Sequence, residues 1–285
     1  MEPPARPVTG RAMLVQEEPM IEFSLEGQVA IITGASRGIG KAIAETFARA
    51  GARVVVCSRK LEGLEAAAAE IREAAPVLAD GNRSGQVLAI QAHVGQADDV
   101  RNLVAQTMEA YGRVDVVVNN AATNPHFGPL LTADEGQWLK ILDTTLLGAV
   151  RLCQAAVPHM REQGGGKIIN MASIAGLRPS AAMGLYGVGK AALIQLTRQL
   201  AMELGPDNIR VNAIAPGIIE TRFSQLLWQT PQISEPLLAG LPLGHFGQPQ
   251  DVAGLALYLA SPAADYVTGA VFSVDGGMAI AGPMG

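Results

Sequence analysis

The feature that most constrains the fold of this chain is a regular alternation of short apolar runs with longer helical stretches. The first run, 29–33 (VAIIT), is rich in β-branched residues, and a glycine-rich turn and a helical stretch over 39–50 follow it. Such runs are typical of strands buried on both faces of a parallel sheet. The same pattern predicts strands at 54–57, 87–93, 114–119, 167–171, 209–214 and 271–274, and helices at 61–73, 97–111, 138–160, 185–204 and 250–260. Because parallel strands need crossovers of one hand, we expect an α/β fold with one doubly wound parallel sheet.

The length and the first segment indicate one domain with a tail. The chain has 285 residues, which suits a single α/β domain. Prolines and mixed charges break every periodicity over 1–24, so we expect a disordered tail there and one domain over 25–285. The stretch of about 217–249 is too long for an ordinary connection, which predicts a lid near the C-terminal end or a disordered loop. A polar, turn-rich loop is expected over 75–86.

Composition excludes several classes of function. The net charge is −5, so no basic footprint for nucleic acid is present. No apolar run approaches the roughly 18 residues of a membrane span. Cys57 and Cys153 form neither a CxxC pair nor a disulfide framework, which favours a cytoplasmic protein. The scattered histidines lack metal-ligand spacing, so we expect no metal site.

The glycine-rich turn after the first strand, 33–40 (TGASRGIG), predicts a nucleotide-binding site. Gly34 allows a tight turn, and Gly38 and Gly40 let backbone approach a pyrophosphate at the start of the next helix. The alternative is a βα turn that binds nothing.

The residues that end the second predicted strand indicate which dinucleotide is bound. An acid there would bind a ribose 2′-hydroxyl, but the chain has Ser58, Arg59 and Lys60. Arg59 together with Arg37 would hold a 2′-phosphate, so we expect NADP(H) rather than NAD(H). The alternative is that these cations are only solvated.

The strongest chemical signal is Tyr186 followed by Lys190, four residues apart on one helix face. An ammonium near the phenol would lower the pKa of Tyr186, which could then act as general acid or base. Ser173 ends the preceding strand, and its hydroxyl would hold a substrate carbonyl beside the phenol.

These segments together resemble the short-chain dehydrogenase/reductase family, which has a Rossmann-type fold, over about 25–279. The resemblance rests on 33–40, 119–122 (NNAA), the set of Ser173, Tyr186 and Lys190, 210–212 (RVN) and 216–221 (PGIIET). Segments 93–95, 124–128 and 222–228 resemble the NADP-dependent carbonyl/retinal reductases of the dehydrogenase/reductase member 4 type.

The resemblance implies roles for individual residues. Tyr186 would transfer the proton, Ser173 would orient the carbonyl, and Lys190 would bind the nicotinamide ribose. It also implies a homotetramer with contacts through the long helices 138–160 and 185–204. The expected cofactor contacts are Gly34, Ser36, Arg37, Gly38, Ile39, Gly40, Ser58, Arg59, His93, Val94, Asn120, Ala121, Tyr186, Lys190, Pro216, Gly217, Ile219 and Thr221. The expected apolar substrate contacts are Phe127, Phe223, Leu227 and Trp228, although the last three could also contact a partner subunit or simply pack against the body.

The chain departs from the family pattern at two positions that bear on chemistry. Thr145 stands where the family has an Asn that kinks a helix and holds a water in a proton relay to the Lys. His93 stands where an Asp often binds the adenine edge, which changes that contact.

The sequence thus predicts an NADP(H)-dependent oxidoreductase that interconverts a hydrophobic ketone or aldehyde and its alcohol. The alternatives are a 3-oxoacyl-thioester reductase, an NAD-dependent alcohol dehydrogenase, and a regulatory protein that binds the nucleotide with turnover weakened at Thr145.

Overall fold

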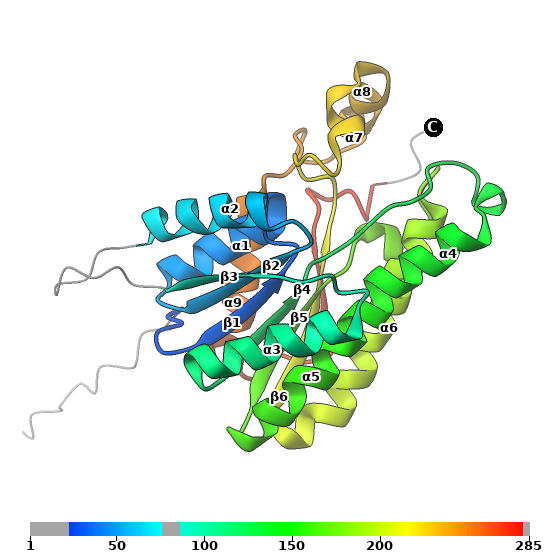
Figure 1. Ribbon diagram of the computed structural model, residues 1–285. Helices are drawn as coiled ribbons and strands as arrows, with labels where there is room; N and C mark the ends of the chain where they lie inside the picture. The colour runs from blue at the N-terminus through cyan, green and yellow to red at the C-terminus, as the bar shows by residue number, and fades with distance from the viewer. Residues whose placement is uncertain (1–22, 76–85, 282–285) are drawn as a thin grey trace, which may run out of the picture.

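One parallel sheet organises the chain. The computed structural model describes residues 23–75 and 86–281. Within these residues, seven parallel strands follow the order β3-β2-β1-β4-β5-β6-β7 (Figure 1). The predicted doubly wound parallel sheet is therefore confirmed. The strands are β1 (Val29–Thr33), β2 (Arg53–Ser58), β3 (Val87–Gln91), β4 (Val116–Asn119), β5 (Gly166–Met171), β6 (Ile209–Pro216) and β7 (Val271–Val274).

Helices cover both faces of the sheet and form two cores. The first face carries α1 (Gly38–Arg49), α2 (Leu61–Ala74) and α9 (Pro249–Ala260). The other carries α3 (Ala97–Tyr111), α5 (Gly148–Glu162) and α6 (Gly184–Leu204). Side chains alternate along each strand, so Ala30 and Ile32 of β1 enter the first core while Val29 and Ile31 enter the second. This burial on both faces explains the continuous apolar runs.

The helices α1 and α9 pack side by side although about 200 residues of chain separate them (Figure 1). Phe47 of α1 and Val252 of α9 are completely buried in the same core. The last helix of the chain therefore completes the packing around the first.

The long helix predicted over 138–160 is interrupted. The structure has α4 (Glu135–Leu142), the π-helical turn η2 (Asp143–Leu147) and then α5. A π-turn widens the backbone ladder by one residue, and such turns often lie at functional sites. Here the turn contains Thr145.

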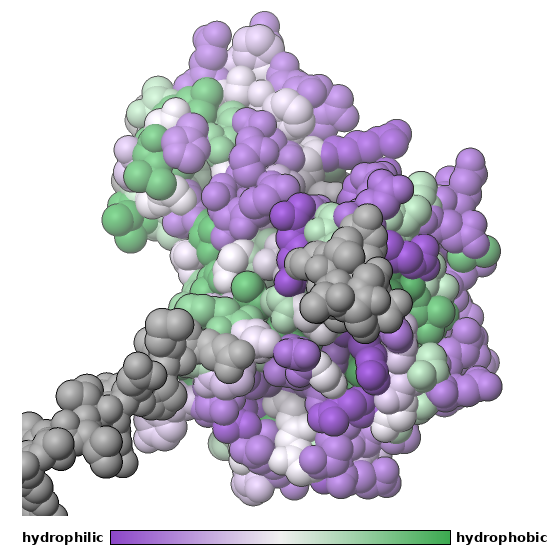
Figure 2. All heavy atoms as spheres, turned by 90° about the vertical axis from the view of Figure 1, so that its left-hand side faces the viewer, coloured by the Kyte–Doolittle hydropathy of each residue, from purple (hydrophilic) through white to green (hydrophobic). Residues whose placement is uncertain are grey.

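The predicted lid is ordered and partly helical. Residues 217–249 contain the short helices α7 (Gln225–Gln229) and α8 (Pro231–Ala239), which project above the sheet (Figure 1). Figure 2 views the molecule from the side of α2 and shows a mostly hydrophilic face, with apolar groups gathered towards its upper left. The tail prediction over 1–24 and the loop prediction over 75–86 fall almost wholly outside the described residues. None of the described helices is long and apolar enough to cross a membrane.

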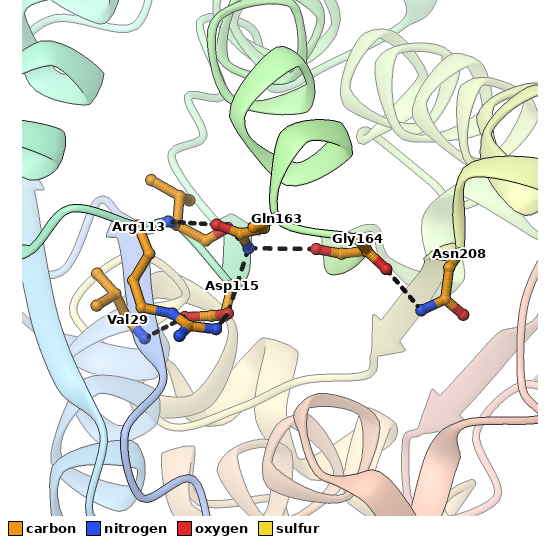
Figure 3. A network of polar contacts seen from close by, with 8 residues as sticks. Val29, Arg113, Asp115, Gln163, Gly164 and Asn208 are labelled. Carbon is orange, nitrogen blue, oxygen red and sulfur yellow. Dashed lines mark hydrogen bonds and ion pairs between the residues drawn. The ribbon is translucent and has the colours of Figure 1, made fainter.

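A polar network joins strands at the amino end of the sheet, away from the carboxyl ends where ligands bind in such folds (Figure 3). Asp115 accepts a hydrogen bond from the Val29 backbone N–H at 2.8 Å and pairs with Arg113 at 2.6 Å. The hydrogen bond to Asp115 raises the pKa of the Arg113 guanidinium. The Gln163 amide donates to the same carboxylate at 3.2 Å. We call this group of four residues the Asp115 network.

Candidate active site

The main cavity of the described residues lies over the carboxyl ends of the strands and has a volume of about 1580 Å³. It begins where the strand order reverses, between β1 and β4, and extends to the lid. Ligands of open α/β sheets bind at this position. The cavity exceeds the volume typical of a single small-molecule pocket, and therefore has room for a dinucleotide with a second molecule.

The glycine-rich turn forms one wall of this cavity. Gly34 and Gly38 have positive φ angles of 66° and 58°, a conformation that favours glycine. A Cβ on Gly40 would lie 2.6 Å from the Gly34 carbonyl oxygen. Asn120 holds the turn from β4 by donating to the Thr33 carbonyl at 2.9 Å. No side chain of the described residues caps α1 at Arg37, so its first N–H groups remain available to phosphates.

The part of the cavity beyond the turn carries the exposed arginines Arg37 and Arg59. Neither forms an ion pair within the described part of the chain. The ring of His93 accepts a hydrogen bond at Nδ1 from the Gly95 N–H at 2.9 Å, which places its proton on Nε2. This wall offers hydrogen-bond donors and positive charge to a ligand.

Ser173, Tyr186 and Lys190 all line the cavity. Ser173 follows β5, and its Oγ accepts from the Ala175 N–H at 3.2 Å. Its hydroxyl also acts to lower the pKa of the Tyr186 phenol. Tyr186 and Lys190 lie one turn apart on α6, with the ammonium 5.5 Å from the ring centroid. Lys190 donates to the Met171 carbonyl at 2.5 Å.

Burial outweighs other effects on the pKa of Tyr186, and the expected lowering of that pKa by Lys190 beside a nicotinamide cation stays a prediction. Burial raises the pKa of Tyr186 to about 12, and the Ser173 hydrogen bond only partly offsets it. Burial also lowers the pKa of Lys190 to about 7. Desolvation disfavours the charged form of each group. Near neutral pH the lysine is only partly charged, which weakens its ability to stabilise a phenolate.

Two glycines that the sequence did not single out explain how the serine reaches the tyrosine. A Cβ on Gly187 would lie 2.5 Å from the Ala175 carbonyl oxygen, and one on Gly176 would lie 2.8 Å from the Ala191 nitrogen. Because these glycines have no Cβ, η3 (Ile174–Gly176) can lie directly on α6. The sequence feature that could have identified one of these glycines is the position of Gly187 directly after Tyr186.

Buried polar groups beneath the cavity were also missed. Asn119 donates to Asn170 at 2.8 Å, and Asn170 donates to Thr197 at 2.9 Å. The Thr33 hydroxyl accepts from the N–H groups of Asn120 and Ala121. These bonds fix the ends of β1, β4 and β5 beside α6.

Thr145 does not line the main cavity. It is buried in η2, and its hydroxyl has no hydrogen-bond partner among the described residues. It lines a small separate cavity together with Thr33 and Asn119. Within the described part of the chain, no protein hydrogen bond therefore connects Thr145 to Lys190.

The lid places most of the expected substrate contacts over the site. Phe127, Phe223 and Leu227 line the cavity, and the Phe223 ring centroid lies 5.9 Å from that of Tyr186. Trp228 does not line it; its indole packs against the apolar cluster that includes Leu241 and Phe246, and it donates to the Thr221 carbonyl at 3.0 Å. The cavity is also lined by every residue expected to contact the cofactor, including Ser36, Ile39, Ser58, Val94, Asn120, Ala121, Pro216, Gly217, Ile219 and Thr221.

The described residues contain no group of three or more His, Cys, Asp or Glu side chains arranged to hold a metal ion. The donors of the cavity are instead backbone N–H groups, hydroxyls and cations, which fit a phosphate-containing dinucleotide.

Comparisons with known proteins match this geometry. The family model described as Enoyl-(Acyl carrier protein) reductase matches residues 34–279. Dehydrogenase/reductase SDR family member 4 of Sus scrofa is 41% identical over 255 residues, covering 90% of this chain and 88% of that protein. A short-chain type dehydrogenase/reductase from Mycobacterium ulcerans superposes with a TM-score of 0.85 at 30% identity, covering 90% of this chain and 92% of the other.

A solved 7α-hydroxysteroid dehydrogenase, in complex with NADH and 7-oxo glycochenodeoxycholic acid, superposes with a TM-score of 0.83 at 36% identity. The match covers 90% of this chain and 96% of that one. The chain therefore belongs to the short-chain dehydrogenase/reductase family, oxidoreductases that use a nicotinamide cofactor, and within it is similar to family member 4.

Proposed function

We propose that this protein is an NADP(H)-dependent oxidoreductase that interconverts a hydrophobic ketone or aldehyde and the corresponding alcohol. One observation carries the proposal. Ser173, Tyr186 and Lys190 meet in the same cavity as the glycine-rich turn and the two exposed arginines, Arg37 and Arg59. This common lining supports proton transfer by Tyr186 next to a bound dinucleotide.

Each residue has a task in this reaction. The reduced nicotinamide supplies a hydride when it is bound. The Ser173 hydroxyl and the Tyr186 phenol hydrogen-bond the substrate oxygen, and Tyr186 gives it a proton during reduction. The raised pKa of Tyr186 keeps the phenol protonated, as the reductive direction requires. Lys190 holds the nicotinamide ribose from α6.

Arg59 and Arg37 support the preference for NADP(H). Both line the cavity, and no carboxylate stands at the end of β2 to reject a 2′-phosphate. Guanidinium groups form strong bidentate hydrogen bonds with phosphate.

The lid supports a hydrophobic substrate. Phe223 lies against Tyr186, and Leu227 lies on the same side of the cavity. A solved relative in this family is complexed with a steroid ketone, 7-oxo glycochenodeoxycholic acid. For this chain we expect a substrate of the same kind, an apolar carbonyl compound.

The test is turnover by the purified protein with NADPH or NADH and a panel of ketones, aldehydes and diketones, followed by absorbance of the reduced nicotinamide. Tyr186→Phe is expected to lower kcat by about 10²–10⁴-fold, the typical contribution of general acid catalysis. Binding of NADPH, measured by fluorescence, should survive that change. A variant as active as the unchanged protein would remove Tyr186 from the proposed role.

One observation favours a second candidate, a regulatory protein that binds nucleotide. The Thr145 hydroxyl lacks a partner among the described residues, so the proton path to Lys190 is altered relative to the family pattern. Tight NADPH binding without turnover of any carbonyl would favour this candidate. Recovery of turnover in Thr145→Asn would then identify the cause. Turnover restricted to 3-oxoacyl thioesters would instead favour a thioester reductase, in keeping with the description of the matching family model.

We also propose a homotetramer located in the cytoplasm. Leu139, Leu147, Val188 and Met202 are exposed apolar side chains on α4, η2 and α6. Exposed apolar groups on neighbouring elements favour burial against another subunit. Light scattering gives the molecular mass and tests this assembly directly.

A further inference from the structure

The charges around the cavity are distributed unevenly. Among the described residues two carboxylates line it, and both precede Ser173 in the sequence. Glu62 starts α2 beside Lys60, and Asp143 is paired with Arg151 at 2.8 Å. From Ser173 to the end of the described chain, the lining contains cations but no carboxylate; those cations are Arg178, Lys190 and Arg222.

These three cations differ in their hydrogen-bond partners and in their location. Lys190 is buried and donates a hydrogen bond to the Met171 carbonyl. Arg222 is exposed and follows Thr221, whose methyl group would lie 3.2 Å from a Cβ on Gly38. Arg222 therefore lies close to the phosphate-binding turn. Of the three cations, Arg178 is therefore the one that we assign to the substrate.

Arg178 is half-buried and nearly free of partners within the described residues. It follows Ser173 by five residues, on the segment that leads from η3 to α6. Its Nη1 donates to the Ala281 carbonyl at 3.1 Å. In the same part of the chain no carboxylate lies within 4.0 Å of it. A guanidinium has five N–H donors, so most of its capacity is unused.

Apolar side chains line the same cavity as the half-buried Arg178. Ile174 and Met278 belong to one buried cluster and also line the cavity, and Leu237 of the lid packs against them. A cation beside such a wall is partly desolvated, which costs free energy unless an anion pairs with it. An oxyanion forms short, bidentate hydrogen bonds with this group.

From this arrangement we propose that the substrate carries an oxyanion, a carboxylate or a phosphate, which Arg178 binds while the apolar part of the substrate lies against Ile174, Met278 and Leu237. This inference rests on the proposed carbonyl chemistry, since Ser173 and Tyr186 hold the reacting oxygen. Arg178 is then a residue that determines specificity, and it takes no part in the transfer of hydride or proton.

The experiment compares matched acids and esters. The substrates are 4-oxo-4-phenylbutanoate, its homologues with one and two more methylenes, and the methyl ester of each. A 3-oxoacyl-coenzyme A thioester is paired with the N-acetylcysteamine thioester of the same acyl group, which lacks the phosphates. The acid/ester pairs test a carboxylate as the bound group, and the thioester pair tests a phosphate.

We expect kcat/KM for the better anionic compound to exceed that of its neutral partner by about 10-fold or more, and Arg178→Gln to remove that advantage, because a hydrogen bond to a charged group contributes about 1.5–3 kcal/mol. The change should appear mainly in KM, and turnover of the neutral partner should stay the same. Arg178→Lys should restore part of the advantage. Arg222→Gln, the matched control, should leave the ratio of anionic to neutral substrate unchanged.

Equal kcat/KM for anionic and neutral partners in the unchanged protein would overturn the inference. So would an equal loss for both partners in Arg178→Gln, which indicates only a structural tie to Ala281. If no carbonyl compound is turned over, that result contradicts the proposed function and leaves the inference about Arg178 to a separate measurement. Binding of the same acids and esters to the protein with NADPH, read as a shift in melting temperature, then decides the inference on its own.

Discussion

Burial moves the pKa values of Lys190 and Tyr186 in opposite directions, to about 7 and about 12. The two side chains share one face of α6, and within the described residues neither has a carboxylate to compensate for its loss of solvent. The pair therefore favours the neutral state of both groups. This makes the stability of the free protein depend on pH.

The contribution of Lys190 has a definite sign. Between the pKa of about 7 in the folded protein and the ordinary value of 10.5, the unfolded chain binds more protons than the folded one. The free energy of unfolding therefore rises with pH across this window, and below pH 7 the full penalty remains. Tyr186 has the opposite effect, because its stabilising contribution is complete below pH 10 and is lost as pH rises towards 12.

Lys190→Met is the variant that isolates this effect. It should be more stable than the unchanged protein near pH 6, and its advantage should shrink by a few kcal/mol as pH rises to 10, at about 1.36 kcal/mol per pKa unit. Urea unfolding at several pH values measures this. A constant difference between the two proteins would mean that Lys190 is well solvated.

Arg59 is expected to set the choice between the two dinucleotides. Arg59→Ala should raise KM for NADPH by about 10-fold or more, since it removes charge-assisted hydrogen bonds of about 1.5–3 kcal/mol. KM for NADH should change little. The matched control is Arg53→Ala at the other end of β2, where the side chain lies against Tyr111. A protein that prefers NADH before any change would remove this role.

The identity of the three central residues could be predicted, but their electrostatics could not. Tyr186 and Lys190 share a helix face by spacing alone. The sign of their pKa shifts depends on burial, which only the tertiary structure determines. Phe223 of the lid, for example, contacts the Tyr186 ring across 37 residues of sequence.

At the scale of elements, glycines set how closely the segments approach. A Cβ at Gly40 would meet the Gly34 carbonyl at 2.6 Å and also the Asn120 amide. Gly40→Ala should therefore lower stability by about 1–3 kcal/mol, as overpacking does, and should weaken NADPH binding.

Gly254 provides the control for that change. It also lies inside a helix, α9, but no atom of the described residues stands within 4 Å of the point that a Cβ would occupy. Gly254→Ala should raise stability by about 0.5–1 kcal/mol, the difference in helix propensity. Thermal unfolding of both variants tests the contrast. Equal effects would mean that the turn relaxes to admit a methyl group.

The regular elements could be predicted from the local sequence pattern, whereas the irregular ones could not. The strand Val29–Thr33 and the helix Ala97–Tyr111 have the predicted bounds, because each buries an apolar pattern of one period. The π-turn at Asp143–Leu147 has no such pattern. It lies where Ile141 and Thr145 pack against Gly189 of α6, a contact that local sequence does not encode.

At the scale of the whole molecule, the site and the Asp115 network occupy opposite ends of the sheet. Asp115→Ala leaves the Val29 N–H and the Arg113 guanidinium without their acceptor. The free energy of unfolding should fall by about 2–3 kcal/mol, and kcat/KM should remain unchanged. Asp98→Ala is the control, because its pair with Arg101 is exposed and contributes less than about 1 kcal/mol. A loss of activity in Asp115→Ala would show that the two ends are coupled.

The packing of α1 against α9 bears on how the chain is made. Synthesis on the ribosome delivers α1 first and α9 almost last, so the apolar face around Phe47 lacks its cover for most of translation. Long-range contacts of this kind slow folding and leave surfaces that aggregate. Nascent chains that end before residue 249 should therefore need chaperones, and a truncated product should be insoluble although its nucleotide-binding turn is complete.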